Sequence, residues 1–208
     1  MNNQIVTKLH LACSKDELRA TLNYILIDDN FAIATDTMIM VKMDLTTQMD
    51  EEFIGKLNGK MIHRTQWALM VGKLITEVDD EKIRVFDGNS GYIDLPFHKD
   101  VEKFPDYREL MNIESRSAKL DSEGEYPSML AFNPDILSKL AKAMFAPKEP
   151  KSVLFKLHRV TFSQKYHGNT RAIFVFPNYK SQCDITGGTY AVLMPQMVDE
   201  SFADYLNM

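Results

Sequence analysis

Short apolar strands separated by turns make up most of this chain, and their order limits the fold more than any other feature. Residues 5–11 and 18–27 alternate or run apolar, as strands do. Asp28, Asp29 and Asn30 favour a turn, and a further apolar strand follows at residues 31–43. The pattern therefore predicts a β-hairpin around this turn.

The rest of the first half adds a loop, a helix and a second hairpin. Residues 46–60 are polar and indicate a loop. Apolar residues at helical spacing predict a helix at residues 65–75, with Thr65 as its N-cap. Residues 82–86 and 92–97 flank a turn rich in Gly, Asn and Asp, which predicts the hairpin.

The second half repeats this order weakly. Residues 114–124 are polar, and a short strand is expected at residues 129–132. The run Asn133-Pro134-Asp135 predicts a helix over residues 136–145, because Asn caps helices, Pro fits the first helical position and Asp suits the helix dipole. Further strands are expected at residues 153–157, 160–164, 171–176 and 189–194. Two halves of strand, helix and strands indicate an α+β protein.

Composition excludes several classes of protein. The 208 residues can bury a core as one large or two small domains. No apolar run approaches the roughly 20 residues that cross a bilayer, and the first eight residues do not resemble a signal peptide, so we expect a cytoplasmic protein with no membrane partner. Cys13 and Cys183 lie outside any metal-ligand spacing and are expected to be small buried residues, so no metal or other cofactor is implied.

Basic residues gather in the second half of an acidic chain. The formal net charge is −5, yet residues 136–182 hold nine basic residues and a single acidic one, Glu149. A local positive field attracts a polyanion at short range, because salt screens charges beyond about 8–10 Å. The alternative is a solvated face on strands and a helix.

Three stretches of the chain stand together as a set: residues 31–40 (FAIATDTMIM), 104–110 (FPDYREL) and 189–197 (TYAVLMPQM). They resemble pieces of the bacterial beta sliding clamp, the ring that tethers DNA polymerase III to DNA. Residues 18–113 are similar to a middle clamp domain, and residues 127–198 to the closing half of the last. The resemblance implies a sliding-clamp-like α+β fold of antiparallel sheets with one main helix per lobe. The expected parts are a lobe at 1–113, a linker or edge strand at 114–126, a second lobe at 127–198 and a tail at 199–208.

The resemblance implies a non-catalytic processivity or scaffold protein in DNA replication that docks polymerase or repair-type client peptides in an apolar pocket between its lobes. The family's lining falls on Thr35, Met38, Met40, Pro105, Leu110, Val192, Met194, Pro195 and Gln196. Where the family favours Gly, His and Arg after the Asp, this chain has Thr37, Met38 and Ile39, so a more apolar pocket is expected. The alternative is that these residues only pack the core between the halves.

Double-stranded DNA is the second partner that the resemblance implies, held weakly and without sequence preference by helices that line the ring. The candidate contacts are Arg64, Lys73, Lys139 and Lys142. A bacterial clamp chain has three domains and closes a ring as a dimer, whereas this chain offers about one and a half to two. A homo-oligomeric ring therefore needs more subunits or a different interface.

Other functions stay open at the level of sequence. A clamp-fold adaptor or decoy would present the pocket without encircling DNA, and the tail at 199–208 would either plug the pocket or pack locally. A cysteine-dependent enzyme would pair Cys13 or Cys183 with one of the five histidines, although no familiar catalytic motif is present. Asp36 and Asp106 are expected to bond backbone groups in turns.

Overall fold

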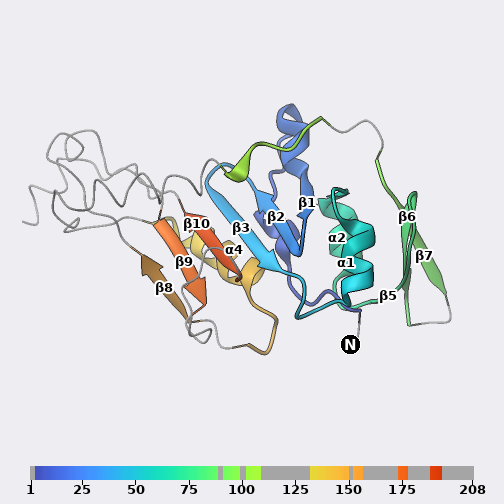
Figure 1. The fold of residues 1–208 in the computed structure, drawn as a ribbon. Helices are drawn as coiled ribbons and strands as arrows, with labels where there is room; N and C mark the ends of the chain where they lie inside the picture. Colours follow the sequence, from blue (N-terminus) through green and yellow to red (C-terminus); the bar gives the residue numbers. More distant parts are fainter. Residues whose placement is uncertain are drawn as a thin grey trace, which may run out of the picture.

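Two antiparallel sheets and three α-helices form the part of the chain that the structure describes (Figure 1). The computed structural model describes residues 3–88, 91–98, 102–108, 132–149, 152–156, 173–177 and 188–193. The larger sheet has the strand order β4-β1-β2-β3-β10-β9-β8, and the smaller one the order β5-β6-β7. The strands are β1 (Tyr24–Asp28), β2 (Phe31–Thr35), β3 (Ile39–Asp44), β4 (Met61–His63), β5 (Leu74–Val78), β6 (Lys82–Phe86), β7 (Tyr92–Pro96), β8 (Val153–Lys156), β9 (Ile173–Pro177) and β10 (Tyr190–Leu193). The helices are η1 (Leu9–Ala12) and η2 (Glu17–Asn23), both 3₁₀, and α1 (Glu51–Leu57), α2 (Arg64–Met70) and α4 (Pro134–Met144).

The two predicted hairpins are confirmed. Strands β1 and β2 pair antiparallel, with Asp28 opposite Phe31, and Asp29 takes a positive φ of 52° in the turn. Aspartate tolerates this left-handed conformation better than most residues. Strands β6 and β7 form the second hairpin, to which β5 adds a third strand.

The prediction of strands at residues 5–11 and 18–27 is wrong for most of their length. Leu9–Ala12 and Glu17–Asn23 are 3₁₀ helices, and only the end of the second stretch enters β1. The side-chain carboxylate of Asp16 accepts a hydrogen bond from the backbone N–H of Leu18 and so begins the second helix. Leu9 and Ala12 are fully buried, so packing against the core selects the helical turn.

The predicted loop at residues 46–60 contains helix α1. Its first turn carries Glu51 and Glu52, which suit a helix N-terminus, and it buries Ile54 and Leu57. A helix of only two turns contains too few apolar residues for helical spacing to be recognised within a polar stretch.

Helix α2 begins and ends earlier than predicted. His63, not Thr65, is the N-cap: its ring accepts from the N–H of Thr65, while Gln66 accepts from the N–H of His63 at 3.2 Å. Gly72, at φ 81°, follows the helix. Leu74 then opens β5, so the end of the predicted helix is a strand.

The second half follows its prediction closely where it is described. Helix α4 starts at Pro134, and the Asn133 side chain accepts from the N–H of Asp135 at 2.8 Å. Strands β8, β9 and β10 match three of the expected strands within one or two residues. The strand at 160–164, nearly all of the one at 129–132, the stretch 109–131 and the tail lie outside the described residues.

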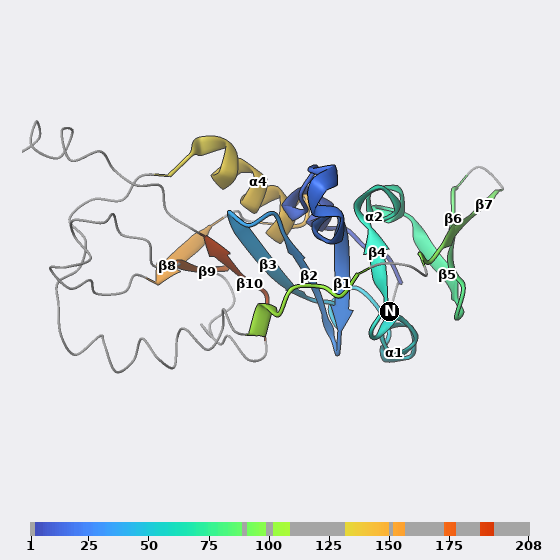
Figure 2. The same ribbon diagram turned by 90° about the horizontal axis from the view of Figure 1, so that it is seen from above.

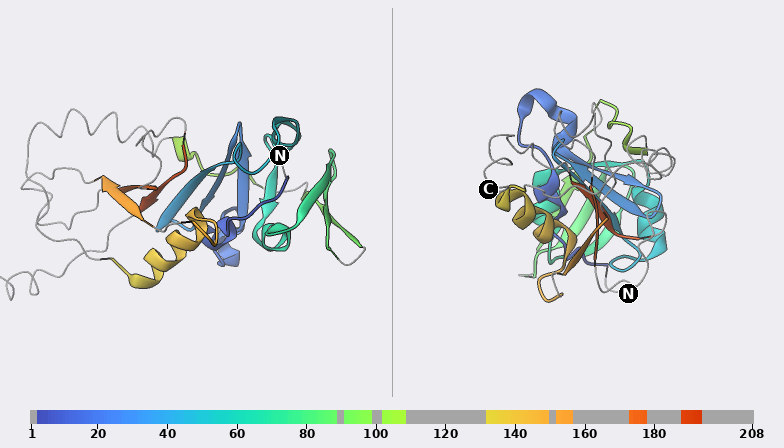
Figure 3. Two further views of the ribbon diagram at one scale, coloured as in Figure 1. Left: turned by 90° about the horizontal axis from the view of Figure 1, so that it is seen from below. Right: turned by 90° about the vertical axis from the view of Figure 1, so that its left-hand side faces the viewer.

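The larger sheet joins the two halves and has different covers on its two faces. Successive residues of β3 alternate, so Ile39, Val41 and Met43 pack in the main core with α4. Met40 belongs to a second cluster on the other face. Figure 2 shows α4 and the 3₁₀ helices on one side of this sheet and residues 102–108 on the other. Figure 3 shows β8 and the three-stranded sheet at opposite ends of the described structure.

Among the described residues, no helix is both long and apolar enough to span a bilayer.

Candidate functional site

The pairing of β3 with β10, which we call the seam, brings together the first and last of the three clamp-like stretches. Val192 lies opposite Met40, and Leu193 opposite Ile39, in an antiparallel register. These residues are about 150 positions apart in sequence, so the pair fixes one half of the chain against the other. The expected contact between the stretch near residue 35 and the end of the chain is confirmed as far as Leu193.

An aromatic cluster covers the face of the seam that carries Met40 and Val192. We call it the linker-side cluster; its buried members are Ile33, Met40, Phe104, Tyr107, Phe174, Phe176, Tyr190 and Val192. The rings of Phe174 and Phe176 stack with centroids 6.5 Å apart, and Tyr190 lies 6.0 and 6.2 Å from them. Phe104 and Tyr107 come from residues 102–108, so the third clamp-like stretch also reaches this site.

Residues 102–108 are anchored to the end of β1. The Tyr107 hydroxyl donates to the carboxylate of Asp28, and Nη2 of Arg108 donates to the same oxygen at 2.5 Å. Burial and the hydrogen bond to Asp28 raise the pKa of Tyr107 to about 12, so the phenol stays protonated as the donor. Asp106 accepts from the N–H of Arg108 at 3.1 Å, which confirms its expected role in a turn.

The cluster contains polar groups that shape its interior. Nζ of Lys42 lies 3.7 Å from the ring centroid of Phe31 and 5.5 Å from that of Tyr190, a cation–π arrangement. Among the described residues, the buried hydroxyl of Tyr190 has no hydrogen-bond partner, and burial raises its pKa. The face is therefore apolar with one buried cation beneath it.

The turn between β2 and β3 is held by its own side chains. Asp36 Oδ1 accepts from the N–H groups of Met38 and Ile39 at 3.0 and 2.9 Å, which confirms its expected role in a turn. Thr35 Oγ1 donates to the carbonyl of Ile39 at 2.8 Å. Thr37 stands at φ 80°, a conformation that a β-branched residue rarely adopts.

The predicted pocket lining divides into a buried floor and an exposed edge. Met40 and Val192 are only 2% and 4% exposed, whereas Met38 is 38% exposed and Pro105 is also exposed. Thr35 is half-buried in the turn. The remaining lining residues, Leu110, Met194, Pro195 and Gln196, lie outside the described residues.

The four candidate DNA contacts have different surroundings. Helices α2 and α4 both pack on η1, and Figure 2 shows α4 on the side of the sheet away from residues 102–108. Lys139 forms an ion pair with Asp36, and Lys73 forms one with Asp87. Arg64 is half-buried, with its Nε unpartnered among the described residues. Lys142 is exposed on α4.

Sequence reasoning missed the residues that enclose the site. Phe174, Phe176 and Tyr190 read as ordinary strand residues, and Asp28 as part of a turn. The alternation Phe174-Val175-Phe176 places two rings on one face of β9, and this signal was present in the sequence.

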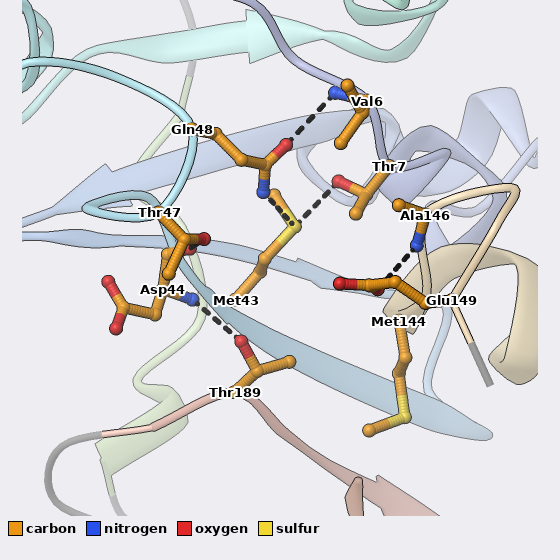
Figure 4. A pocket seen from close by; sticks show the side chains of 10 residues that line it. All are labelled: Val6, Thr7, Met43, Asp44, Thr47, Gln48, Met144, Ala146, Glu149 and Thr189. Carbon is orange, nitrogen blue, oxygen red and sulfur yellow. Dashed lines mark hydrogen bonds between the residues drawn. The ribbon is translucent and has the colours of Figure 1, made fainter. Parts of the chain in front are cut away.

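A polar hollow of about 110 Å³ opens on the α4 side of the seam (Figure 4). Thr7 and Gln48 direct polar atoms at the sulfur of Met43, at 2.7 and 3.4 Å. Thr189 accepts from the N–H of Asp44 at 3.1 Å. The lining residues are Val6, Thr7, Met43, Asp44, Thr47, Gln48, Met144, Ala146, Glu149 and Thr189. These polar groups already bond one another, so the hollow is a structural junction between the halves.

In the described part of the chain, the remaining reactive groups to consider are Cys13 and any residues that could bind a metal ion. Cys13 is 2% exposed as expected, and burial raises its pKa to about 12, which keeps the thiol protonated at neutral pH. Cys183 lies outside the described residues. No group of three or more His, Cys, Asp or Glu residues among those described could hold a metal ion.

Comparison with solved structures identifies the fold. The beta sliding clamp of C. crescentus matches with a TM-score of 0.54 and 14% identity, over 92% of this chain and 63% of that one. The DNA polymerase III beta subunit of Thermotoga maritima matches with a TM-score of 0.53 and 12% identity, over 95% and 63%. The beta subunit of Borrelia burgdorferi gives 0.51 and 13%, over 95% and 60%. No family model matches the sequence, and no curated protein matches it.

The chain has the sliding-clamp fold, as the resemblance predicted, in an α+β arrangement of antiparallel sheets. It spans about three fifths of the length of these clamps.

Proposed function

We propose that this chain is a non-catalytic, DNA-associated scaffold of the sliding-clamp type that docks client peptides at the linker-side face of the seam. The clients are extended peptides with apolar anchors, of the kind that polymerases or repair proteins carry. We further propose that the protein acts in the cytoplasm in DNA replication and assembles with copies of itself.

The observation that carries the client site is the meeting of three distant stretches at one apolar face. Met40 and Val192 pair across the seam, and Phe104 packs on the same cluster. Met38 and Pro105 supply exposed apolar surface from two of these stretches. Methionine adapts its shape to different anchors, which suits a site that accepts several clients.

DNA contact is supported by the placement of the helices. Arg64 and Lys142 come from α2 and α4, which pack on the same 3₁₀ helix. Binding through a few cations without base contacts is weak and salt-sensitive, with a slope of about −0.9 in log affinity per neutralised phosphate. A closed ring tolerates such weak contacts, because topology then prevents dissociation.

An adaptor that presents the client face without encircling DNA is the second candidate, and one observation favours it. Two of the four candidate DNA contacts, Lys73 and Lys139, form ion pairs with carboxylates of the chain itself. The net charge of −5 adds a repulsion toward phosphate. A cysteine-dependent enzyme has less support, because the buried thiol of Cys13 stays protonated.

Retention on DNA of different topology separates the two candidates. The chain is incubated at low salt with nicked circular plasmid and, separately, with the same plasmid linearised. Each sample is then washed with about 0.5 M salt. At this salt concentration charges on the surface are screened within roughly 5 Å. A ring stays on the circle and slides off the linear form. If the protein is released equally from the circular and the linear plasmid, it does not encircle DNA, and the adaptor becomes the favoured function.

The client site is tested in parallel with a library of labelled ten-residue peptides. Met38→Asp introduces a charge at the exposed edge and is expected to weaken binding of any captured peptide at least tenfold. Leu69→Asp is the matched control, because Leu69 is 47% exposed, close to the 38% of Met38, and lies outside the cluster. Equal affinity of both variants and the wild type would contradict this site.

A further inference from the structure

The turn between β2 and β3 is tied to helix α4 by a single charged contact. Asp36 uses Oδ1 for the N–H groups of Met38 and Ile39. Its other oxygen, Oδ2, accepts from Nζ of Lys139, 103 positions further along the chain. One carboxylate therefore holds the turn that presents Met38 and also reaches the helix that carries two of the four candidate DNA contacts, Lys139 and Lys142.

The ion pair between Asp36 and Lys139 is partly buried, and part of its surface remains exposed to solvent. The side chain of Asp36 is 14% exposed and that of Lys139 is 30% exposed. Partial burial strengthens the attraction beyond that of a fully solvated pair. The side chain of Lys139 keeps 30% of its surface exposed, so a phosphate group from solvent can approach it.

The turn contains a residue in a strained conformation. Thr37 stands at φ 80° between Asp36 and Met38. A β-branched residue stays in this region only where neighbouring bonds fix the backbone. Loss of the Lys139 contact removes the tie between this turn and α4 and leaves only the hydrogen bonds within the turn and the contact of Thr37 with Arg19.

We propose that Asp36 is a positioning residue that couples the two faces of the molecule: a polyanion at α4 draws Lys139 away from Asp36 and thereby loosens the turn that presents Met38. This inference rests on the proposed function, since it makes DNA a regulator of the client site. DNA binding and client binding therefore oppose each other. The turn is held when Lys139 pairs with Asp36, and this pair is broken when Lys139 binds phosphate. By linkage, a bound client lowers DNA affinity by the same factor.

The methyl group of Met38 reports the state of the turn without any client. The chain is labelled with ¹³C at its methionine methyls, Met38→Leu assigns the signal, and a 20-base-pair duplex is added at low salt. In the wild type the Met38 signal is expected to shift with a midpoint equal to the duplex Kd. Asp36→Asn keeps an oxygen for the two N–H groups but removes the charge, so its Met38 signal is expected to start near the shifted position and to move little.

Two variants on α4 separate positioning from simple loss of charge. Lys139→Arg keeps a positive charge beside Asp36, so its Met38 signal before duplex is added is expected to match that of the wild type. Lys142→Gln removes an exposed cation from the same helix without touching Asp36, so it weakens duplex binding yet preserves the full Met38 shift at saturation. With a captured peptide as probe, duplex is expected to raise the peptide Kd about fivefold or more in the wild type and not in Asp36→Asn.

The outcomes distinguish failure of this inference from failure of the function. A duplex that binds the wild type but leaves the Met38 signal unmoved overturns the coupling alone. A Met38 shift that persists in Asp36→Asn also overturns it, because the signal then travels by another route. No binding of the duplex to the wild type overturns both the DNA partner and the coupling.

Discussion

Thr37 occupies a backbone conformation that suits glycine. A left-handed φ costs an L-residue about 1–2 kcal/mol, whereas glycine adopts it freely and loses roughly 0.5–1 kcal/mol of chain entropy instead. Thr37, at φ 80°, is therefore expected to gain stability on change to Gly, by about 0.5–1 kcal/mol of unfolding free energy. Urea denaturation measures the gain, and Thr37→Ala serves as a control that keeps the strained φ. Equal stability of the Gly and Ala variants would show that the backbone is not strained here.

His63 caps helix α2 through a ring nitrogen that accepts a hydrogen bond, so the cap requires the neutral imidazole. Burial, the nearby His98 and Arg64 lower the pKa of His63 below 6.5, and Tyr24 packs its ring 5.0 Å away. The unfolded chain then binds more protons, so stability is complete above about pH 6.5 and falls as pH drops through the folded pKa.

Denaturation at pH 7.5 and 5.5 checks this expectation. His63→Asn keeps a capping oxygen without a titrating group, so its loss of stability between the two pH values is expected to be smaller than that of the wild type. Part of the loss remains, because burial, Arg64 and Lys8 also lower the pKa of His10. An unchanged pH dependence in the variant would contradict the role of His63.

Helix α4 is the element that closes the core over the seam. It contacts β3, β10 and η1, and its Leu140 is 2% exposed. Leu140→Ala is expected to lower the unfolding free energy by about 2–5 kcal/mol, because the cavity lies between elements that cannot all close on it. Ser138→Ala, exposed on the same helix, should change it by less than about 0.5 kcal/mol. A loss below 1 kcal/mol for Leu140→Ala, roughly the scale of a surface change, would mean that the helix packs loosely.

Elements with strong local signals could be predicted, and those selected by packing could not. Asn133, Pro134 and Asp135 specify the start of α4, and the turn residues specify both hairpins, because each acts on its own neighbours. The two-turn helix α1 and the 3₁₀ helix at Leu9–Ala12 lack such signals, since burial of a few apolar residues decides them.

The candidate site depends on contacts between residues far apart in the sequence. The pairing of Met40 with Val192 followed from a resemblance to a known fold and not from periodicity, which reads only local order. For the same reason the rings of Phe174 and Tyr190 could not be assigned to the site, nor could Lys139 be assigned to Asp36.

At the scale of the whole molecule, the described parts of the two halves of the chain share one core. Buried residues of β3, α4 and β10, among them Val41, Leu140 and Ala191, belong to a single cluster, and one sheet runs through both halves. We therefore expect a single unfolding transition in urea, with the same midpoint by circular dichroism and by fluorescence of Trp67, which is fully buried. Two separated transitions would instead indicate lobes at 1–113 and 127–198 that fold independently.

The proposed closed ring has a molecular mass that can be measured in solution. We expect the ring of the proposed function to contain three copies, because each chain spans about three fifths of the length of the clamps that it matches. Three chains of 23.9 kDa give about 72 kDa. Such a ring requires a head-to-tail contact between opposite ends of the described structure, where Figure 3 shows β8 and the three-stranded sheet.

Strand β7 is an edge of the described three-stranded sheet, and its Tyr92 is 63% exposed, so it is suited to pair with a neighbouring copy. Tyr92→Lys is expected to shift the light-scattering mass from about 72 toward 24 kDa, because a charged edge resists strand pairing. Leu18→Lys changes a side chain that is 94% exposed and lies in the 3₁₀ helix η2, not on a strand, so it should leave the proposed trimer intact. A wild-type mass near 24 kDa at every concentration would reject the ring, and a trimer unaffected by Tyr92→Lys would move its interface away from β7.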